Sequence, residues 1–267
     1  MSARMTLRAL PALLRVGMAE ALAYRAEFVI WMLTTTLPLV MLGLWTSVAA
    51  EGPFRNYSSA DFIAYYLAAL IVRNLTGSWV VWQINDEIRR GVMSMRLLRP
   101  IHPFVAYAAT HLSAIPLRGV VALPVTLILL ATAGRGAVTH DPAQWLLLVP
   151  SLAAAWALTF TMLLAIGCLA FFIDKSMAVM DVYFGVFAVL SGYLIPLDLL
   201  PGWAQAVTAW TPFRFMLSAP IEILLGRHSL ADAVGLVTVQ WAWSALMFAI
   251  AMWVWRAGIR RFEAVGG

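Results

Sequence analysis

The sequence has few charged residues, a single lysine and a single cysteine. Only 12% of its 267 residues are Asp, Glu, Lys or Arg, whereas 63% are hydrophobic. A soluble globular domain carries about 25% charged residues, so this chain cannot cover a hydrated surface of its size. The lone Cys168 excludes an intrachain disulfide. We therefore expect a membrane protein and not a soluble enzyme.

Motifs for catalysis and for nucleotide binding are also missing. The sequence contains no G-x-S-x-G, H-E-x-x-H or C-x-x-C pattern and no G-x-x-x-x-G-K-[ST] loop. The only lysine, Lys175, stands in Asp-Lys-Ser, away from any glycine-rich turn. The histidines are scattered along the chain and suggest no metal cluster. We predict that the chain is not an enzyme, holds no cofactor or metal of its own and hydrolyses no nucleotide.

Apolar segments long enough to cross a bilayer follow one another through most of the chain. A spanning helix needs about 20 mostly apolar residues. Six segments come close to this length or exceed it: residues 28–50, 62–82, 105–133, 145–173, 178–195 and 231–255. The expected fold class is an all-α membrane protein with six transmembrane helices, forming one domain over residues 28–267.

The distribution of arginines predicts the orientation of these spans. With both termini in the cytoplasm, only Arg55, Arg135, Arg214 and Arg227 fall in outer loops, and most other basic residues lie inside. Cytoplasmic loops are enriched in Lys and Arg, so this orientation is favoured. The surplus of 18 basic over 13 acidic residues then indicates membrane lipids as partners, and not nucleic acid.

Residues 1–27 have the pattern of an amphipathic helix lying on the membrane surface. Leu7, Leu14 and Met18 recur at helical spacing, with Arg8 and Arg15 beside this apolar stripe. Charges interrupt any apolar core, so the segment is not a cleavable signal peptide. The alternative interpretation is a frayed tail.

The loop at residues 83–104, between the second and third spans, is the sizeable cytoplasmic loop. Asp86 and Glu87 are expected at a helix start, and Gly91 is expected to break that helix. A short amphipathic helix would follow, with Met93 and Leu97 apolar and Arg96 basic. Such a helix could transmit a push from a cytoplasmic partner; the alternative is an anchor that binds lipid headgroups. The candidate contact residues are Asp86, Glu87, Ile88, Arg89, Arg90, Gly91, Val92, Met93, Ser94, Arg96 and Leu97.

The segment between the fifth and sixth spans, about residues 196–230, is too apolar for an ordinary loop and is interrupted by prolines. Its stretches 199–210 and 215–225 are too short to cross a bilayer. We expect a re-entrant helical pair in the outer leaflet, with Trp203 and Trp210 at the level of the headgroups. The simpler reading of the tryptophans is an anchoring belt at the headgroups.

Arg73 and Arg118 are the charges deepest in the predicted spans. A charge near the bilayer midplane is costly and should face protein or water. Both residues are therefore candidates for the wall of a translocation path. The structural alternative is that they pair with Glu27, with Asp181 or with carbonyls at helix ends.

Several segments together resemble one known family. They are residues 24–28, 60–66, 73–82, 98–103, 191–196 and 200–203. In this combination the chain resembles the permeases of bacterial type-2 ABC exporters, and most closely a subfamily whose permeases often work as pairs of related chains. The resemblance covers nearly the whole chain.

This resemblance implies a membrane core of two like or related six-helix subunits, bound to two separate ATPase subunits. The partner ATPases would hold ATP and Mg, and the loop at 86–97 would couple their closure to the spans. The outer re-entrant pair would help to gate the outer side, with Pro196, Leu200, Trp203 and Trp210 as the gate residues. The location implied is the bacterial inner membrane. Rival interpretations are an ATP-independent secondary transporter or channel, an intramembrane enzyme acting on lipids, and a non-transporting scaffold.

Overall fold

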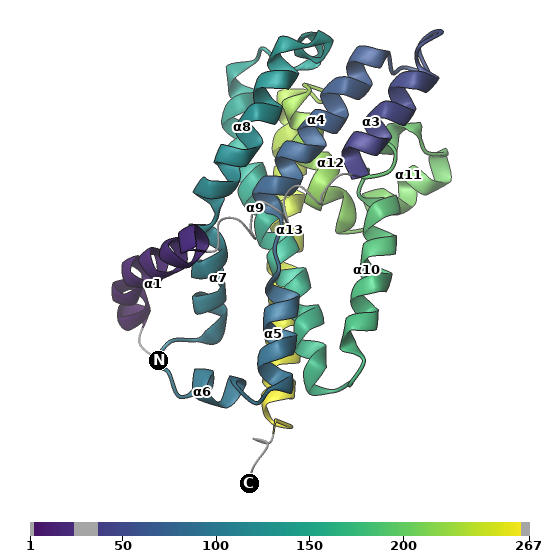
Figure 1. Ribbon diagram of the computed structural model, residues 1–267. Helices are drawn as coiled ribbons and strands as arrows, with labels where there is room; N and C mark the ends of the chain where they lie inside the picture. Colours follow the sequence, from purple (N-terminus) through teal and green to yellow (C-terminus); the bar gives the residue numbers. More distant parts are fainter. Residues whose placement is uncertain (1–2, 24–36, 263–267) are drawn as a thin grey trace.

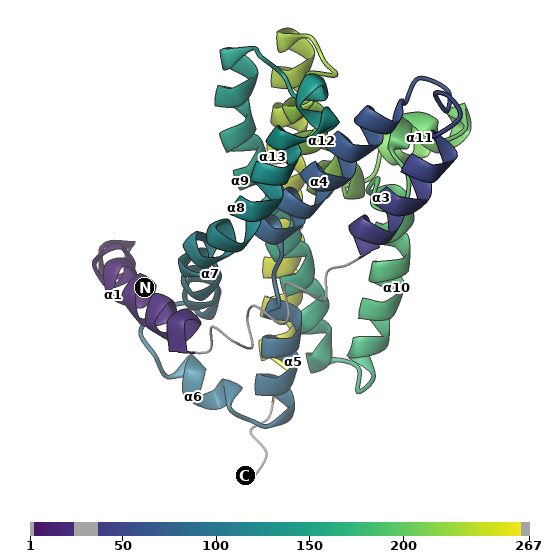
Figure 2. The same cartoon turned by 45° about the horizontal axis from the view of Figure 1, so that its top comes forward.

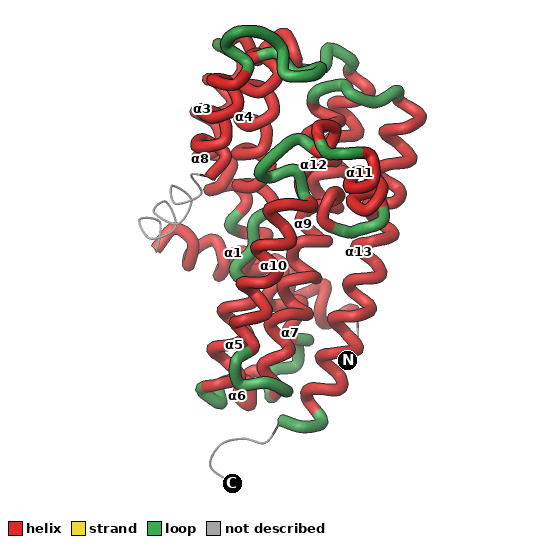
Figure 3. The backbone as a smooth tube through the Cα atoms, turned by 90° about the vertical axis from the view of Figure 1, so that its right-hand side faces the viewer, coloured by secondary structure: helices red, strands yellow, loops and turns green. Residues whose placement is uncertain are grey.

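The computed structural model describes residues 3–23 and 37–262, and this part of the chain is helical without a β-strand (Figures 1 and 3). The α-helices are α1 (Ala3–Ala23), α3 (Leu37–Val48), α4 (Ser59–Thr76), α5 (Val80–Arg89), α6 (Met93–Leu97), α7 (Pro103–Ser113), α8 (Ile115–Ala131), α9 (Pro142–Cys168), α10 (Ser176–Leu190), α11 (Gly202–Ala209), α12 (Phe213–Leu224) and α13 (Leu230–Ile259). Short 3₁₀ turns, η1 (Ala133–Ala137), η2 (Leu169–Phe171) and η3 (Leu197–Leu199), complete them. The expected all-α class is confirmed.

Helices α9 and α13 form the long central pair. The stretches Pro142–Phe171 and Leu230–Ile259 have mean hydropathies of 2.1 and 1.6 and are long enough to cross a membrane. They correspond to the fourth and sixth predicted spans. Their interface carries buried hydrogen bonds, including one from the Ser151 hydroxyl to the Gln240 side chain at 2.9 Å. Such bonds hold apolar helices together where burial in lipid gives no driving force.

The second predicted span, 62–82, is wrong as one continuous helix. Helix α4 begins with a capping box between Ser58 and Asp61, and it ends at Thr76. Gly77 then adopts extended angles, φ −58° and ψ 150°, and α5 begins only at Val80. Glycine and serine have low helix propensity, so residues 77–78 are a weak point in an otherwise apolar helix.

The third predicted span, 105–133, is also interrupted. Ala114 separates α7 from α8, and the helical stretch bends by 44° between Pro103–Val120 and Ala122–Leu129. Pro124 explains the bend, because a proline inside a helix removes one hydrogen bond and its ring collides with the carbonyl four residues earlier.

The first and fifth predicted spans are represented by shorter apolar helices, α3 and α10. Residues 28–36 of the first span lie outside the described residues. Between α10 and α13, the two expected short helices are present as α11 and α12. Helix α12 is buried along most of its length, whereas α11 is exposed on one face, with Trp203 75% and Trp210 84% exposed.

Helix α1 lies beside α7, at one side of the bundle (Figures 1 and 2). Gly17 is buried at this contact, where an added methyl group would collide with Ser113. Arg8 and Arg15 are exposed, as the amphipathic pattern predicts. The helix expected within residues 1–27 is thus present for residues 3–23, and its position on a membrane surface stays a prediction.

Helix α6 bridges α5 and α7 at one end of the molecule, which we call the α6 end (bottom of Figure 1). Helices α11 and α12, with the beginnings of α4, α9 and α13, lie toward the opposite end. The core between the two ends is built on α4, α9 and α12, with Tyr65, Tyr66 and Leu217 fully buried.

Candidate functional site

A buried carboxylate joins α5, α6 and α7 at the α6 end. Glu87, only 9% exposed, accepts hydrogen bonds from the Nε of Arg96 and from the hydroxyl of Tyr107, both at 2.5 Å. A second guanidinium nitrogen of Arg96 also pairs with Glu87, and this guanidinium lies 4.5 Å from the Tyr107 ring centroid. We call these three residues the Glu87 clamp. The clamp fixes α6 against the ends of two longer helices.

The electrostatics of the clamp keep Arg96 charged. Burial alone would lower the pKa of Arg96, but the hydrogen bonds and the charge of Glu87 raise this pKa above its usual value. A two-nitrogen contact between a guanidinium and a carboxylate is among the strongest of side-chain pairs.

The expectation that Asp86 and Glu87 begin a helix is wrong. Both lie in the last turn of α5, because Val81, Ile84 and Ile88 continue a buried apolar face into the predicted loop. Negative charge is unfavourable at a helix C-terminus. Arginines offset it: Arg96 pairs with Glu87, and an exposed Arg90 pairs with Asp86 at 2.7 Å.

Gly91 ends α5, as expected, and turns the chain into α6. Its φ of 73° is in the left-handed region, which a glycine adopts without strain. The expected short helix follows, with Met93 fully buried as its anchor. The Ser94 hydroxyl donates to the Gly91 carbonyl at 2.7 Å and closes this turn.

An apolar surface faces away from the clamp. Val92 is 49%, Met95 65%, Leu97 36% and Leu98 80% exposed; we call these four residues the α6 surface. Three exposed arginines flank this segment in the sequence: Arg89, Arg90 and Arg99. Contiguous exposed apolar side chains with a charged rim are typical of a site that contacts another protein or a membrane.

The structure divides the predicted loop residues into two groups. One group is buried or half-buried and holds the loop in place: Glu87, Ile88, Met93 and Arg96. The other group is exposed: Asp86, Arg89, Arg90, Val92 and Leu97. The predicted contact residues did not include Met95, Leu98 or Tyr107. Tyr107 stands 20 residues from Glu87, and no local pattern connects the two.

The two deep arginines lie near the break between α4 and α5. Arg118 is 3% exposed; it donates a hydrogen bond to the Gly77 carbonyl and lies 4.9 Å from the Trp79 ring centroid. This contact matches the structural alternative, pairing with a helix-end carbonyl. The Arg73 guanidinium lies 4.8 Å from the ring centroid of Phe187 on α10. A role for either residue in translocation stays a prediction.

The opposite end of the molecule is held by ionic contacts. Asp61 at the start of α4 pairs with Arg227, in the loop before α13, at 2.8 Å. The Arg227 guanidinium also lies 4.8 Å from the Tyr57 ring centroid, and the Tyr57 hydroxyl donates to Asp198 at 3.2 Å. Of the predicted gate residues, Pro196 is buried, Leu200 is half-buried, and Trp203 and Trp210 are exposed.

A second buried carboxylate lies beside these contacts, on α12. Glu222 is 5% exposed and accepts hydrogen bonds from Arg214, Ser218 and His228 at 2.6–2.7 Å. Burial by itself would raise the pKa of Glu222, but the hydrogen bond to His228 and the charge of Arg214 lower it to about 2. The same hydrogen bond raises the pKa of His228. The sequence analysis missed this cluster.

Within residues 3–23 and 37–262, no group of three or more His, Cys, Asp or Glu side chains could hold a metal ion. The described helices instead carry two ionic clusters at opposite ends, the Glu87 clamp and the cluster around Glu222. The α6 surface is exposed beside the Glu87 clamp.

Comparison with known proteins identifies the family. The profile described as "ABC-2 family transporter protein" matches residues 29–266, which is most of the chain. A comparison with curated proteins gave no match. A membrane protein of this composition and helical architecture, matched over this range, belongs to the ABC-2 family of transporter proteins.

Proposed function

We propose that the chain is the permease subunit of an ATP-driven exporter. It would form the substrate path together with a second permease chain, identical or related, and would be driven by two ATPase subunits that bind ATP and Mg. In this proposal six spans cross the bacterial inner membrane, and α11 and α12 form the re-entrant pair on the outer side. Both termini and the α6 end face the cytoplasm, where the ATPases would dock.

The observation that carries this proposal is the α6 surface. Four exposed apolar side chains lie on a short segment that the Glu87 clamp holds to α5 and α7. A chain without a nucleotide-binding loop can be driven by ATP only through a contact with another protein that binds ATP. Because α6 is fixed by buried charge-assisted hydrogen bonds, force applied to its exposed face reaches two helices at once.

The structure separates two kinds of residue in this loop. Leu97, Met95 and Leu98 would touch the ATPase, with Arg90 at the rim. Glu87 would act indirectly, by holding α6 in place. Charge reversal at Arg90 should therefore weaken docking, whereas charge reversal at Glu87 should disorder the loop that docks. Both changes should uncouple ATP hydrolysis from export.

The experiment is co-purification of the ATPase subunit from native membranes. We expect Met95→Asp and Leu98→Asp to lose the ATPase and to abolish export while the permease still inserts. Leu230→Asp is the matched control, because Leu230 is 45% exposed in the first turn of α13, away from α6. Normal ATPase binding and normal export in both α6 variants would refute the proposal.

The second candidate function is an ATP-independent secondary transporter or channel. It requires transport by this chain alone in liposomes, driven by an ion gradient and insensitive to vanadate. An intramembrane lipid-modifying enzyme would instead convert lipid in the same liposomes, and a scaffold would do neither. Co-purification with a vanadate-sensitive ATPase distinguishes the exporter from all three.

A further inference from the structure

The loop that joins α12 to α13, at the end of the molecule opposite α6, is held by polar contacts. We call its residues 226–229 the strap. Gly226, Arg227 and Ser229 are exposed and His228 is half-buried. Gly226 has a φ of 61°, which favours glycine, and an added methyl group would press on Thr139. Because the strap has no buried apolar side chain, its position depends on charges and hydrogen bonds.

Three contacts fasten the strap to other elements. Arg227 pairs with Asp61 in the first turn of α4 at 2.8 Å, and the Nε2 of His228 lies 2.6 Å from Glu222 on α12. The carbonyl of His228 accepts a hydrogen bond from the side chain of Gln144, in the first turn of α9, at 2.8 Å. The strap therefore ties the first turns of α4 and α9 to α12.

The charges that face His228 balance when its ring is protonated. Glu222 contacts the ring, and Asp198 of η3 adds a second negative charge, whereas Arg214 of α12 supplies one positive charge. Two carboxylates and one guanidinium leave one negative charge, which a protonated His228 cancels. Glu222 is only 5% exposed, and a buried charge that loses a partner is strongly destabilising.

His228 is the group in this cluster that titrates near neutral pH. Histidine ordinarily changes its charge in this range, and the hydrogen bond to Glu222 raises the pKa of His228. The other charged groups around the strap have partners that keep their charge or carry none near neutral pH: Asp61 with Arg227, Asp198 with the Tyr57 hydroxyl, Arg55 with the Leu199 carbonyl, Asp141 with the Ala143 N–H and Asp232 with the Ser229 hydroxyl.

We propose that the strap closes the end opposite α6 in a proton-dependent way. While His228 carries its proton, its ion pair with Glu222 holds the strap against α12, and Arg227 and Gln144 hold it against α4 and α9. When pH rises and the proton leaves to water, the ion pair is lost and the strap detaches. The switch needs no ATPase, and only its placement on the outer side rests on the proposed exporter function.

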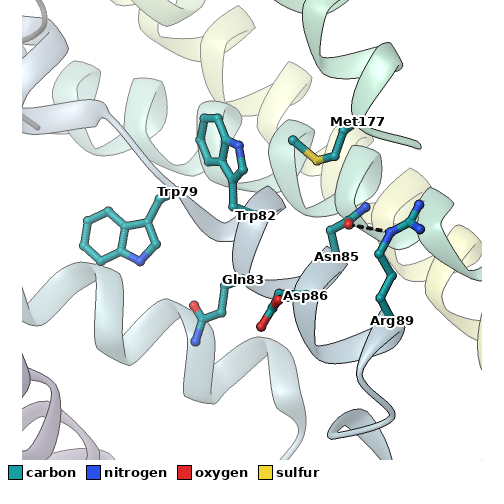
Figure 4. Close-up of a pocket in the computed structure, with 7 residues that line it drawn as sticks. All are labelled: Trp79, Trp82, Gln83, Asn85, Asp86, Arg89 and Met177. Atoms are coloured by element: carbon teal, nitrogen blue, oxygen red, sulfur yellow. Dashed lines mark hydrogen bonds between the residues drawn. The ribbon is translucent and has the colours of Figure 1, made fainter. Parts of the chain in front are cut away.

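The cavity of about 620 Å³ beside α5 lies away from the strap (Figure 4). It is lined by residues of the segment 79–89 and by Met177 of α10, toward the α6 end of the molecule. The titration of His228 should therefore leave this region unchanged. A peptide from α5 that contains Trp82 and Asn85 then serves as an internal reference.

The test is hydrogen–deuterium exchange of the full chain in nanodiscs at pH 6 and pH 9, measured by mass spectrometry on a peptide that spans the strap. The amides of Gly226 and Arg227 donate to the carbonyls of Ile223 and Glu222, so they report the release of the strap. Variants are compared with wild type at the same pH, so the chemical pH dependence of exchange cancels.

We expect His228→Gln to exchange roughly tenfold faster than wild type at pH 6, because it lacks the charged hydrogen bond. At pH 9 the two should exchange at the same rate, since wild-type His228 is then neutral. His228→Lys keeps a positive charge, so it should exchange more slowly than wild type at pH 9.

His140→Gln is the matched control, because His140 is exposed in the loop before α9, and this variant should behave like wild type at both pH values. Equal exchange of wild type and His228→Gln at pH 6 would overturn the proposal. So would an equal acceleration of His228→Gln at both pH values, or the same acceleration in the α5 peptide. These outcomes do not involve ATPase co-purification, so a failure here leaves the exporter function standing.

Discussion

Arg118 on α8 donates a hydrogen bond to the backbone carbonyl of Gly77, where α4 ends. This contact joins the break between α4 and α5 to α8, which follows both helices in the chain. The carbonyl at a helix end has no partner within the helix and needs one from outside when it is buried. A buried guanidinium therefore stabilises the break between α4 and α5.

Replacing Arg118 by Met should destabilise the protein. The Gly77 carbonyl would lose a charged donor, and leaving a buried acceptor without its partner costs about 1–3 kcal/mol. Thermal unfolding in a fixed detergent should show a lower Tm for Arg118→Met. The exposed Arg135 serves as control, and Arg135→Met should leave the Tm unchanged. Equal Tm values for wild type and Arg118→Met would contradict this role.

Replacing Gly192 by Ala should destabilise the turn after α10. Gly192 has a φ of 86°, and an added methyl group would collide with the hydroxyl of Tyr65, which donates to the Gly192 carbonyl at 2.8 Å. The left-handed conformation alone costs a non-glycine residue roughly 1–2 kcal/mol. We expect a clear fall in Tm. Gly185→Ala within α10 has free space for its methyl group and should not lower the Tm.

Loss of the Glu87 clamp should release α6. In Glu87→Ala, Arg96 and Tyr107 lose their shared acceptor, so the segment around Met93 should detach from α7. Limited trypsin digestion should then cleave after Arg96 several times faster than in wild type. Asp86→Ala is the control, because it removes only an exposed pair, worth about 0.3–0.5 kcal/mol. Cleavage at the wild-type rate in Glu87→Ala would contradict the clamp.

Stability should depend on pH through His228. Its hydrogen bond to Glu222 raises the pKa of His228 above the usual value of about 6.5. The charged pair therefore contributes its full stabilisation below about pH 6.5, and this contribution is lost as pH rises through the raised pKa. The Tm difference between wild type and His228→Gln should be largest at pH 6 and should shrink by pH 9. A difference that grows toward pH 9 would have the wrong sign.

The helical class and the long apolar helices could be predicted from the sequence. Mean hydropathy is averaged over about 20 residues, so no single residue decides it. Helices α9 and α13 follow the predicted spans closely. The breaks at Gly77 and Ala114 were missed, since a single peptide unit hardly changes the mean hydropathy of a 20-residue window. The two prolines of this segment differ in effect: Pro116 lies in the first turn of α8, whereas Pro124 bends the helix.

The polar contacts were harder to predict than the helices. Asp86 and Glu87 were recognised as important, but the partners of Glu87 depend on tertiary packing, because Tyr107 comes from α7. Ser218 and Glu222 have the i, i+4 spacing of a helical hydrogen bond, which could have indicated the second cluster. His228 and Arg214 reach the same carboxylate from positions that no periodicity connects.

The interruption at Gly77 also changes how displacement travels along the bundle. Main-chain hydrogen bonding stops with the bond from Gly77 to Arg73 and resumes with the bond from Trp82 to Trp79. The upper part, α4, packs on α3, α8, α12 and α9, whereas the lower part, α5, packs mainly on α9. A tilt of α5 therefore reaches α4 through the packing of both helices on α9, and not through a continuous helical main chain.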